Sequence, residues 1–380
     1  MADYLRQMPH QGSADLARRP SAISRFHIDI PLLLLLLALT AYGLVVLYSG
    51  SGKDMGAVIR QGRYFLLAYA IMFIVAQFSM AQIMRWAPWL YVVALGTLVA
   101  VMLVGVGAKG AQRWLSLGGF RFQPSEIMKL VLPLTVAWYL ADRTLPPRFF
   151  HILVALALIA LPAALILQQP DLGTALLIAA SGLFVLFMAG MGWRYILGAV
   201  VLAGASAWPA WMFVLKDYQK QRILTMLDPE SDKLGAGWNI IQSKTAIGSG
   251  GWDGKGWMNG TQSHLDFLPE SHTDFIIAVM SEEFGLRGVL VLLGIYLLIL
   301  LRGFLIGVRA QTSFGRMMAG SLTLTFFVYI FVNMGMVAGL LPVVGVPLPL
   351  VSAGGTSVVT LMAGFGILMA ISTEKSVGPR

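Results

Sequence analysis

The sequence predicts an all-α, polytopic membrane protein with about ten transmembrane helices. Hydrophobic residues make up 57% of its 380 residues and charged residues only 12%, and the mean hydropathy is +0.76. The apolar residues are gathered into repeated runs of roughly 20, the length that crosses a bilayer. The chain contains no cysteine, which excludes disulfides and thiolate metal sites.

The first predicted helix follows a basic leader, residues 1–29, in which we recognise no secretory signal peptide. The first apolar run is long enough to remain as a spanning helix. Some later runs are short or contain Pro or Gly, so their boundaries are approximate. In chain order, the predicted spans are 30–48, 64–80, 86–105, 127–141, 149–167, 173–190, 193–215, 276–301, 317–340 and 350–371. They form one membrane domain, 30–371, which is followed by a short tail, 372–380.

The connections between the spans predict the orientation. On one side they carry an excess of Lys and Arg, among them Arg85, Arg143 and Arg194, whereas the opposite connections hold nearly balanced charges. The positive-inside rule then places both termini in the cytoplasm and the long loop 216–273, between spans seven and eight, outside. Topology and contact with anionic membrane lipids also account for the net charge of +9, so no nucleic-acid partner is expected.

The stretch 263–275 concentrates ionisable residues at the outer entrance to the eighth span. In a chain with so few charges, such a cluster indicates a chemical function. Its last acid would lie near a helix N-terminus, where a carboxylate can also serve only to complement the helix dipole. The spacing matches no standard metal-binding signature. The members of the cluster are His264, Asp266, Glu270, His272 and Asp274.

Charged residues also occur in or beside the fourth and sixth spans. Lys129 costs roughly 2.5–3.5 kcal/mol at membrane depth unless it is paired, and Glu126 lies one turn earlier on the same helical face. Asp171 is expected at the N-terminus of the sixth span, from where it could pair with Lys129 across an outward cavity. Two interpretations stay open: a salt bridge that only fixes helix packing, or a polar cavity for a charged headgroup.

Several motifs together make the chain similar to a known family. They are 110–114 (GAQRW), 122–126 (FQPSE), 169–174 (QPDLGT), 227–229 (LDP), 260–263 (GTQS), 267–270 (FLPE), 272–275 (HTDF) and 345–352 (GVPLPLVS). Over nearly the whole span-bearing region the chain resembles the SEDS family of membrane proteins (shape, elongation, division and sporulation), and its elongation branch more than its division branch. One departure is Ala353, where the family usually has an aromatic residue.

The resemblance implies a peptidoglycan glycosyltransferase of the bacterial cytoplasmic (inner) membrane. Such an enzyme polymerises lipid II on the outer face of the membrane, during cell-wall elongation and the maintenance of rod shape. The implied partner is a class B penicillin-binding protein, the transpeptidase of the elongation complex. The family's most important acidic residue falls on Asp274, and the cavity residues that it associates with activity fall on Glu126, Lys129 and Asp171.

Glycan polymerisation needs a base that deprotonates the acceptor 4-hydroxyl as it attacks the anomeric carbon of the donor. Asp274 is the candidate base, and His272 is a neighbouring candidate for contact with the substrate. Direct attack by the hydroxyl would invert the anomeric carbon. The undecaprenyl-pyrophosphate leaving group is already an anion and needs little protonation, so a single base is consistent with this chemistry.

The departing pyrophosphate needs positive charge. Lys129, Arg113 and, as a further candidate, Arg60 could supply it. The sequence establishes no cofactor. The one considered is a divalent cation, Mg²⁺ or Mn²⁺, that would bridge the pyrophosphate and either Glu126 or Asp171.

Two rival functions use the same features. A lipid II flippase also needs a headgroup cavity, but predicts charges along a full transmembrane path, whereas the unusual carboxylates here map to the outer half. A scaffold that only holds the elongation enzymes together predicts that Asp274→Asn is silent.

Overall fold

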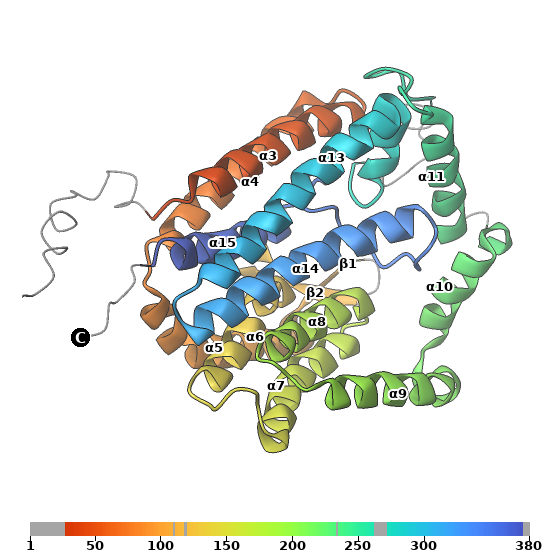
Figure 1. Cartoon of the computed structure of the whole chain (residues 1–380). Helices are drawn as coiled ribbons and strands as arrows, with labels where there is room; N and C mark the ends of the chain where they lie inside the picture. The colour runs from red at the N-terminus through yellow and green to blue at the C-terminus, as the bar shows by residue number, and fades with distance from the viewer. Residues whose placement is uncertain (1–26, 109–110, 118–119, 233–234, 262–271, 375–380) are drawn as a thin grey trace, which may run out of the picture.

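The computed structural model describes residues 27–108, 111–117, 120–232, 235–261 and 272–374, and these form a bundle of helices (Figure 1). The helices of its first half are α3 (Ile30–Gly50), α4 (Met55–Ala76), α5 (Met80–Val104), α6 (Pro124–Ala141), α7 (Phe149–Gln168) and α8 (Leu172–Met188). Those of its second half are α9 (Trp193–Pro209), the π-helix η1 (Ala210–Val214), α10 (Asp217–Leu227), the 3₁₀-helix η2 (Pro229–Asp232), α11 (Ala236–Gly250), α13 (Ile276–Arg309), α14 (Ser313–Val337) and α15 (Thr356–Ser372).

A helix lies at every span that the sequence predicts. In the described part of the chain, seven helices are long and apolar enough to cross a membrane: α3, α4, α5, α7, α9 with its extension to Phe213, α13 and α14. The helices α8 and α15 are apolar but shorter, and α6 carries the charges Glu126 and Lys129 near its start. Several boundaries differ from the prediction. The second span begins at Met55 instead of 64, the eighth extends to Arg309 instead of 301, and the last begins at Thr356 instead of 350 because the preceding residues form a loop.

The two loops that are predicted to lie outside hold more structure than hydropathy indicates. The connection between α5 and α6 forms a three-stranded antiparallel sheet of β1 (Val106–Ala108), β2 (Ala111–Leu117) and β3 (Phe120–Phe122), in the order β1-β2-β3. The described part of the predicted loop 216–273 contains α10, η2 and α11. These segments are short, and several of them are polar, so hydropathy alone does not reveal them.

The described chain begins and ends at the same end of the bundle, which we call the terminal end (Figure 1). Asp29 caps α3 by accepting from the backbone N–H of Leu32 at 3.1 Å. Arg302 of α13 donates to both carboxylate oxygens of Asp29, at 3.0 and 2.6 Å, and Ser372 of α15 donates to the same group. One buried carboxylate therefore ties three helices together at the terminal end.

At the opposite end, residues 338–355 run into the interior of the bundle between α14 and α15, and we call this segment the core loop. Leu350 is only 1% exposed, and a Cβ atom on Gly43 of α3 would lie 2.7 Å from its carbonyl oxygen. Tyr296 of α13 donates a hydrogen bond to the carbonyl of Pro349 at 2.7 Å. Non-helical backbone is tolerated at membrane depth only where protein or a cavity surrounds it, and the largely buried stretch 346–352 of the core loop meets this condition.

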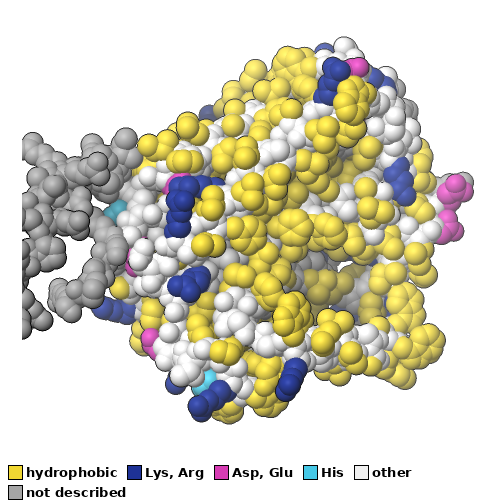
Figure 2. Space-filling view, viewed as in Figure 1, with side chains coloured by type: hydrophobic (Ala, Val, Ile, Leu, Met, Phe, Trp, Pro, Cys, Tyr) yellow, Lys and Arg dark blue, Asp and Glu magenta, His cyan; other side chains and the backbone are white. Residues whose placement is uncertain are grey.

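The helix α9 differs from the other spans because none of its residues is buried. In Figure 1 it lies apart from the main bundle, and Figure 2 shows a hollow between the two. The visible face of the molecule is covered mainly by apolar side chains, as a surface in contact with lipid would be (Figure 2).

Candidate active site

An ion pair marks the first turn of α6. Glu126 lies in that turn, and its Oε1 atom is 2.8 Å from Nζ of Lys129. The other oxygen, Oε2, accepts a hydrogen bond from the hydroxyl of Thr360 on α15 at 3.2 Å. The side chains of Lys129 and Glu126 are 12% and 9% exposed, so the helical pair that the sequence predicts is formed in a mostly buried position.

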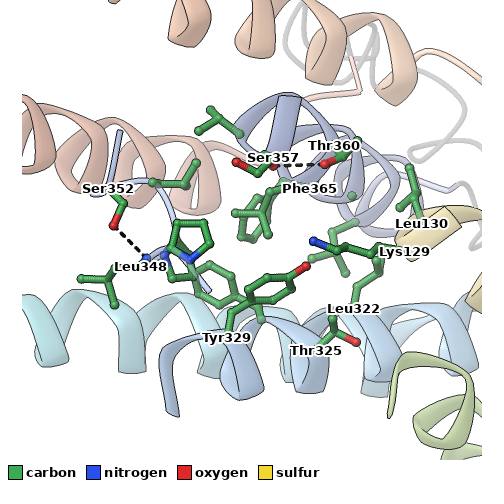
Figure 3. Close-up of a pocket in the computed structure, with 18 residues that line it drawn as sticks. Lys129, Leu130, Leu322, Thr325, Tyr329, Leu348, Ser352, Ser357, Thr360 and Phe365 are labelled. Atoms are coloured by element: carbon green, nitrogen blue, oxygen red, sulfur yellow. Dashed lines mark hydrogen bonds between the residues drawn. The ribbon is translucent and has the colours of Figure 1, made fainter. Parts of the chain in front are cut away.

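Lys129 opens onto a cavity between α6, α14 and α15. Its ammonium group lies 5.2 Å from the ring centre of Tyr329, and Figure 3 shows the two side chains pointing toward each other. The cavity is partly open, and the roughly 740 Å³ of space along its walls includes open solvent. Its polar groups are those of Lys129 and Tyr329 with the hydroxyls of Thr325, Ser352, Ser357 and Thr360. Its other walls are mainly apolar, from Leu130, Leu322, Phe326, Leu361 and Phe365.

Asp171 caps α8 but does not pair with Lys129, so that sequence-based expectation was wrong. Its Oδ1 accepts from the N–H of Thr174 at 3.2 Å, as the predicted helix N-terminus requires. Its Oδ2 accepts from the side chain of Gln123 at 3.4 Å and lies 3.5 Å from Nη1 of Arg113. Each buried carboxylate thus has its own cation, Arg113 for Asp171 and Lys129 for Glu126.

Arg113, on β2, holds the turn between α7 and α8. Its Nε donates to the carbonyl of Gln169 at 3.3 Å and its Nη2 to that of Pro170 at 2.5 Å, while Nη1 faces Asp171. All three guanidinium nitrogens therefore face this turn, and the side chain is 32% exposed. The arrangement positions Asp171 and leaves Arg113 only a partial surface for a substrate phosphate.

The structure does not bring Arg60 to this group. Its side chain is 66% exposed at the start of α4 and lies 3.5 Å from the exposed carboxylate of Asp54. His272 is exposed, beside Asp274 in sequence. His264, Asp266 and Glu270 lie outside the described residues.

Asp274 lies in the turn that precedes α13, half-buried against the core loop. A Cβ atom on Gly345 would be 3.4 Å from its Oδ2, and Gly345 has a φ of +74°. One residue earlier in the core loop, the carbonyl of Val344 would be 3.0 Å from a Cβ on Gly173, in the first turn of α8. The core loop therefore lies between the turn of Asp274 and the helix that Asp171 caps, and its residues 347–350 line the cavity of Lys129.

The donor set does not fit a resident divalent cation. The described residues contain no group of three or more His, Asp or Glu side chains that could hold an ion. Both candidate ligands are already engaged by N–H or O–H donors, Glu126 by Lys129 and Thr360, and Asp171 by Gln123 and Thr174. We therefore derive no step through a protein-bound metal.

Sequence analysis missed four residues that complete the site: Tyr329 and Asn333 on α14, Thr360 on α15 and Ser352 in the core loop. Asn333 offered a signal, because an amide inside an apolar 25-residue helix needs a partner. The others are weakly polar residue types, and only the assembled bundle shows which group each one contacts.

The chain is similar to curated proteins over almost its full length. It is 54% identical to the peptidoglycan glycosyltransferase MrdB of Escherichia coli K12, across 93% of this chain and 95% of that protein. It is 39% identical to the probable peptidoglycan glycosyltransferase FtsW of Geobacter metallireducens, across 92% of this chain and 96% of that protein.

Solved structures share the fold. A protein from a peptidoglycan synthase complex that coordinates polymerization and crosslinking matches with a TM-score of 0.80 and 32% identity, over 90% of this chain and 97% of that one. The rod shape determining protein RodA of Thermus thermophilus matches with a TM-score of 0.68 and 28% identity, over 90% and 96% of the two chains. Residues 30–377 match the model of the FtsW, RodA and SpoVE family, described as cell cycle proteins. The chain is therefore a multi-pass inner-membrane protein that belongs to the FtsW/RodA/SpoVE family, as the SEDS resemblance predicted.

Proposed function

We propose that this chain is a peptidoglycan glycosyltransferase that polymerises lipid II during cell-wall elongation. One observation carries the proposal: a cationic, hydroxyl-bearing cavity with apolar walls shares the core loop with the half-buried carboxylate of Asp274. The 54% identity to a peptidoglycan glycosyltransferase over 93% of the chain supports the same activity.

The cavity suits an amphiphilic substrate. Lys129 and Tyr329 supply polar groups for an anionic headgroup, and the mainly apolar remainder suits a lipid chain. The positive charge of Lys129 is shared with Glu126, which holds the ammonium group in place before the substrate arrives. Such fixed charge stabilises a developing anion without reorganisation.

In the proposed reaction, Asp274 accepts the proton of the acceptor 4-hydroxyl. At the same time, the hydroxyl oxygen bonds to the anomeric carbon of the donor. The bond from that carbon to the pyrophosphate oxygen breaks, and the undecaprenyl pyrophosphate leaves with the electron pair. Attack from the opposite side inverts the anomeric carbon. Lys129 stabilises the departing phosphate charge, and Asp171, fixed by Arg113, borders the site from α8.

The proposal includes an orientation and a partner. The terminal end faces the cytoplasm, and Asp274 and the cavity face the outer side, where lipid II is polymerised. A class B penicillin-binding protein crosslinks the new strands, in keeping with the likeness to a complex that coordinates polymerization and crosslinking.

The test is polymerisation of purified lipid II by the protein and its penicillin-binding partner. We expect Asp274→Asn to lose at least about a hundredfold in rate, as removal of a general base does. Asp253→Asn, at an aspartate that is 66% exposed and paired with Arg287, serves as the matched control and should polymerise normally.

Each other outcome identifies a rival. Normal glycan strands from folded Asp274→Asn protein would exclude Asp274 as the base. A wild-type protein that neither polymerises nor transports lipid II would favour a scaffold. Transport of lipid II across vesicles without polymerisation by the wild type would favour a flippase.

A further inference from the structure

The backbone turn that carries Asp274 is held at three consecutive carbonyl groups. The carbonyls of residues 272, 273 and 274 each accept one hydrogen bond from a different donor. The donors are the N–H of Ala353 at 3.0 Å, the hydroxyl of Ser352 at 2.6 Å and the side-chain amide of Asn333 at 2.8 Å, respectively. The first two belong to the core loop and the third to α14, so the turn rests on elements far from it in sequence.

The two side-chain donors are themselves fixed. Asn333 is completely buried and gives its second amide hydrogen bond to the carbonyl of Val346 at 2.7 Å. Ser352 is 2% exposed and accepts from the N–H of Leu348 at 2.8 Å, the bond drawn in Figure 3. Neither donor can turn away without breaking the core loop, because each also supports the loop's own backbone.

This support fixes the backbone from which the carboxylate of Asp274 projects. The carboxylate lies against Gly345, in the same core loop that holds the backbone of the turn. A movement of the turn therefore changes the distance between the carboxylate and anything bound over the loop. Displacing a reacting group by about 1 Å can cost on the order of a hundredfold in rate.

We propose that Asn333 and Ser352 are positioning residues for Asp274, which set the catalytic rate without binding the reacting groups. This rests on the proposed function, in which Asp274 is the base. Asn333 is the cleaner probe because it does not line the cavity, whereas Ser352 does. The donor of Ala353 is its backbone N–H, which does not depend on the side chain, so the departure from the family's aromatic residue leaves this hydrogen bond intact.

The experiment measures kcat and KM for lipid II polymerisation, and Tm, in the full chain with its penicillin-binding partner. The variants are Asn333→Ala, Ser352→Ala and Ser352→Thr, which keeps the hydroxyl. The matched control is Ser321→Ala, which removes a fully buried hydroxyl on α14 that donates to the carbonyl of Ser181 at 2.7 Å, away from the turn. We expect the two donor-removing variants to lose about ten- to a hundredfold in kcat while KM is maintained. Ser352→Thr should recover most of the rate, and Ser321→Ala should lose Tm but not kcat.

The inference is overturned if both donor-removing variants keep the wild-type kcat, or if Ser321→Ala loses as much kcat at a similar loss of Tm. If Asn333→Ala does not fold, the kcat values of Ser352→Ala and Ser352→Thr test the positioning role by themselves. Asp274→Asn distinguishes a failure of the proposed base from a failure of the proposed positioning role. If it is active, the proposed base is wrong, and if it is inactive while Asn333→Ala and Ser352→Ala are active, only the positioning role is wrong.

Discussion

Gly345 leaves room for the carboxylate of Asp274: a methyl group in its place would stand 3.4 Å from Oδ2. The backbone of Gly345 also has a φ of +74°, which residues with a side chain rarely adopt. Both facts make this glycine a sensitive point of contact between the core loop and the proposed base.

Gly345→Ala should therefore lower both stability and turnover. The left-handed backbone costs roughly 1–2 kcal/mol with a Cβ, and the strain falls where the new methyl group would contact the carboxylate at 3.4 Å. Gly190→Ala is the matched control, since it has a φ of +83° and its Cβ would meet only Pro146, at 3.8 Å. Thermal unfolding should give similar losses for both variants, while polymerisation assays should show a lower kcat only for Gly345→Ala. Equal turnover in the two would rule out the contact with Asp274 as functionally important.

Lys129→Met should destabilise the protein because it leaves Glu126 as an unpaired charge that is 9% exposed. Removing one partner of a buried ion pair costs on the order of 3–5 kcal/mol. The double variant Glu126→Gln/Lys129→Met should recover most of the Tm and remain inactive, since the phosphate has lost its cation. If the double variant also recovers polymerisation, the pair serves helix packing alone.

Arg113→Lys tests whether this arginine positions Asp171 or simply supplies charge. A lysine keeps the charge but cannot reproduce three contacts from a planar fork, to Gln169, Pro170 and Asp171. We expect a loss of about 2 kcal/mol in unfolding free energy together with a lower kcat. The control is Arg121→Ala, at an exposed arginine, which should change stability and kcat little. A fully active and stable Arg113→Lys protein would instead favour charge as its role.

The buried carboxylate of Asp29 at the terminal end should make the stability of the folded protein depend on pH. Burial raises its pKa, but hydrogen bonds from Arg302, Ser372 and the N–H of Leu32 outweigh this effect, so the pKa lies below the ordinary 3.8. A lowered carboxyl pKa stabilises the folded state above pH 3.8, and this contribution is lost as the pH falls through the folded-state pKa.

The Tm of Asp29→Asn in detergent should consequently lie below that of wild type at neutral pH, and the gap should narrow below pH 3.8. Asp142→Asn, at an exposed aspartate just after α6, should track wild type throughout. If the difference in Tm between wild type and Asp29→Asn stays constant down to the lowest accessible pH, the charge of Asp29 does not contribute to stability.

The spans were predictable because each is an apolar run whose length is fixed by the thickness of the bilayer. The helical pair of Glu126 and Lys129 was predictable because residues three apart lie on the same helical face. The partner of Asp171 did not follow, because Arg113 reaches it from a strand that hydropathy does not reveal. The support of Asp274 was equally hidden. Its donors Asn333 and Ser352 lie 59 and 79 residues away from the carbonyls they hold, and only the folded core loop brings them together.

The core loop also bears on the order in which the protein is made. Two of the three donors that hold the turn of Asp274, Ser352 and Ala353, follow α14 and therefore leave the ribosome after it. A nascent chain that has inserted its spans only as far as Val337 contains Asp274 but lacks two of the three donors that hold its turn. Synthesis itself would then keep the protein inactive until the core loop and α15 are in place, and a chain truncated after Val337 should insert and yet form no glycan.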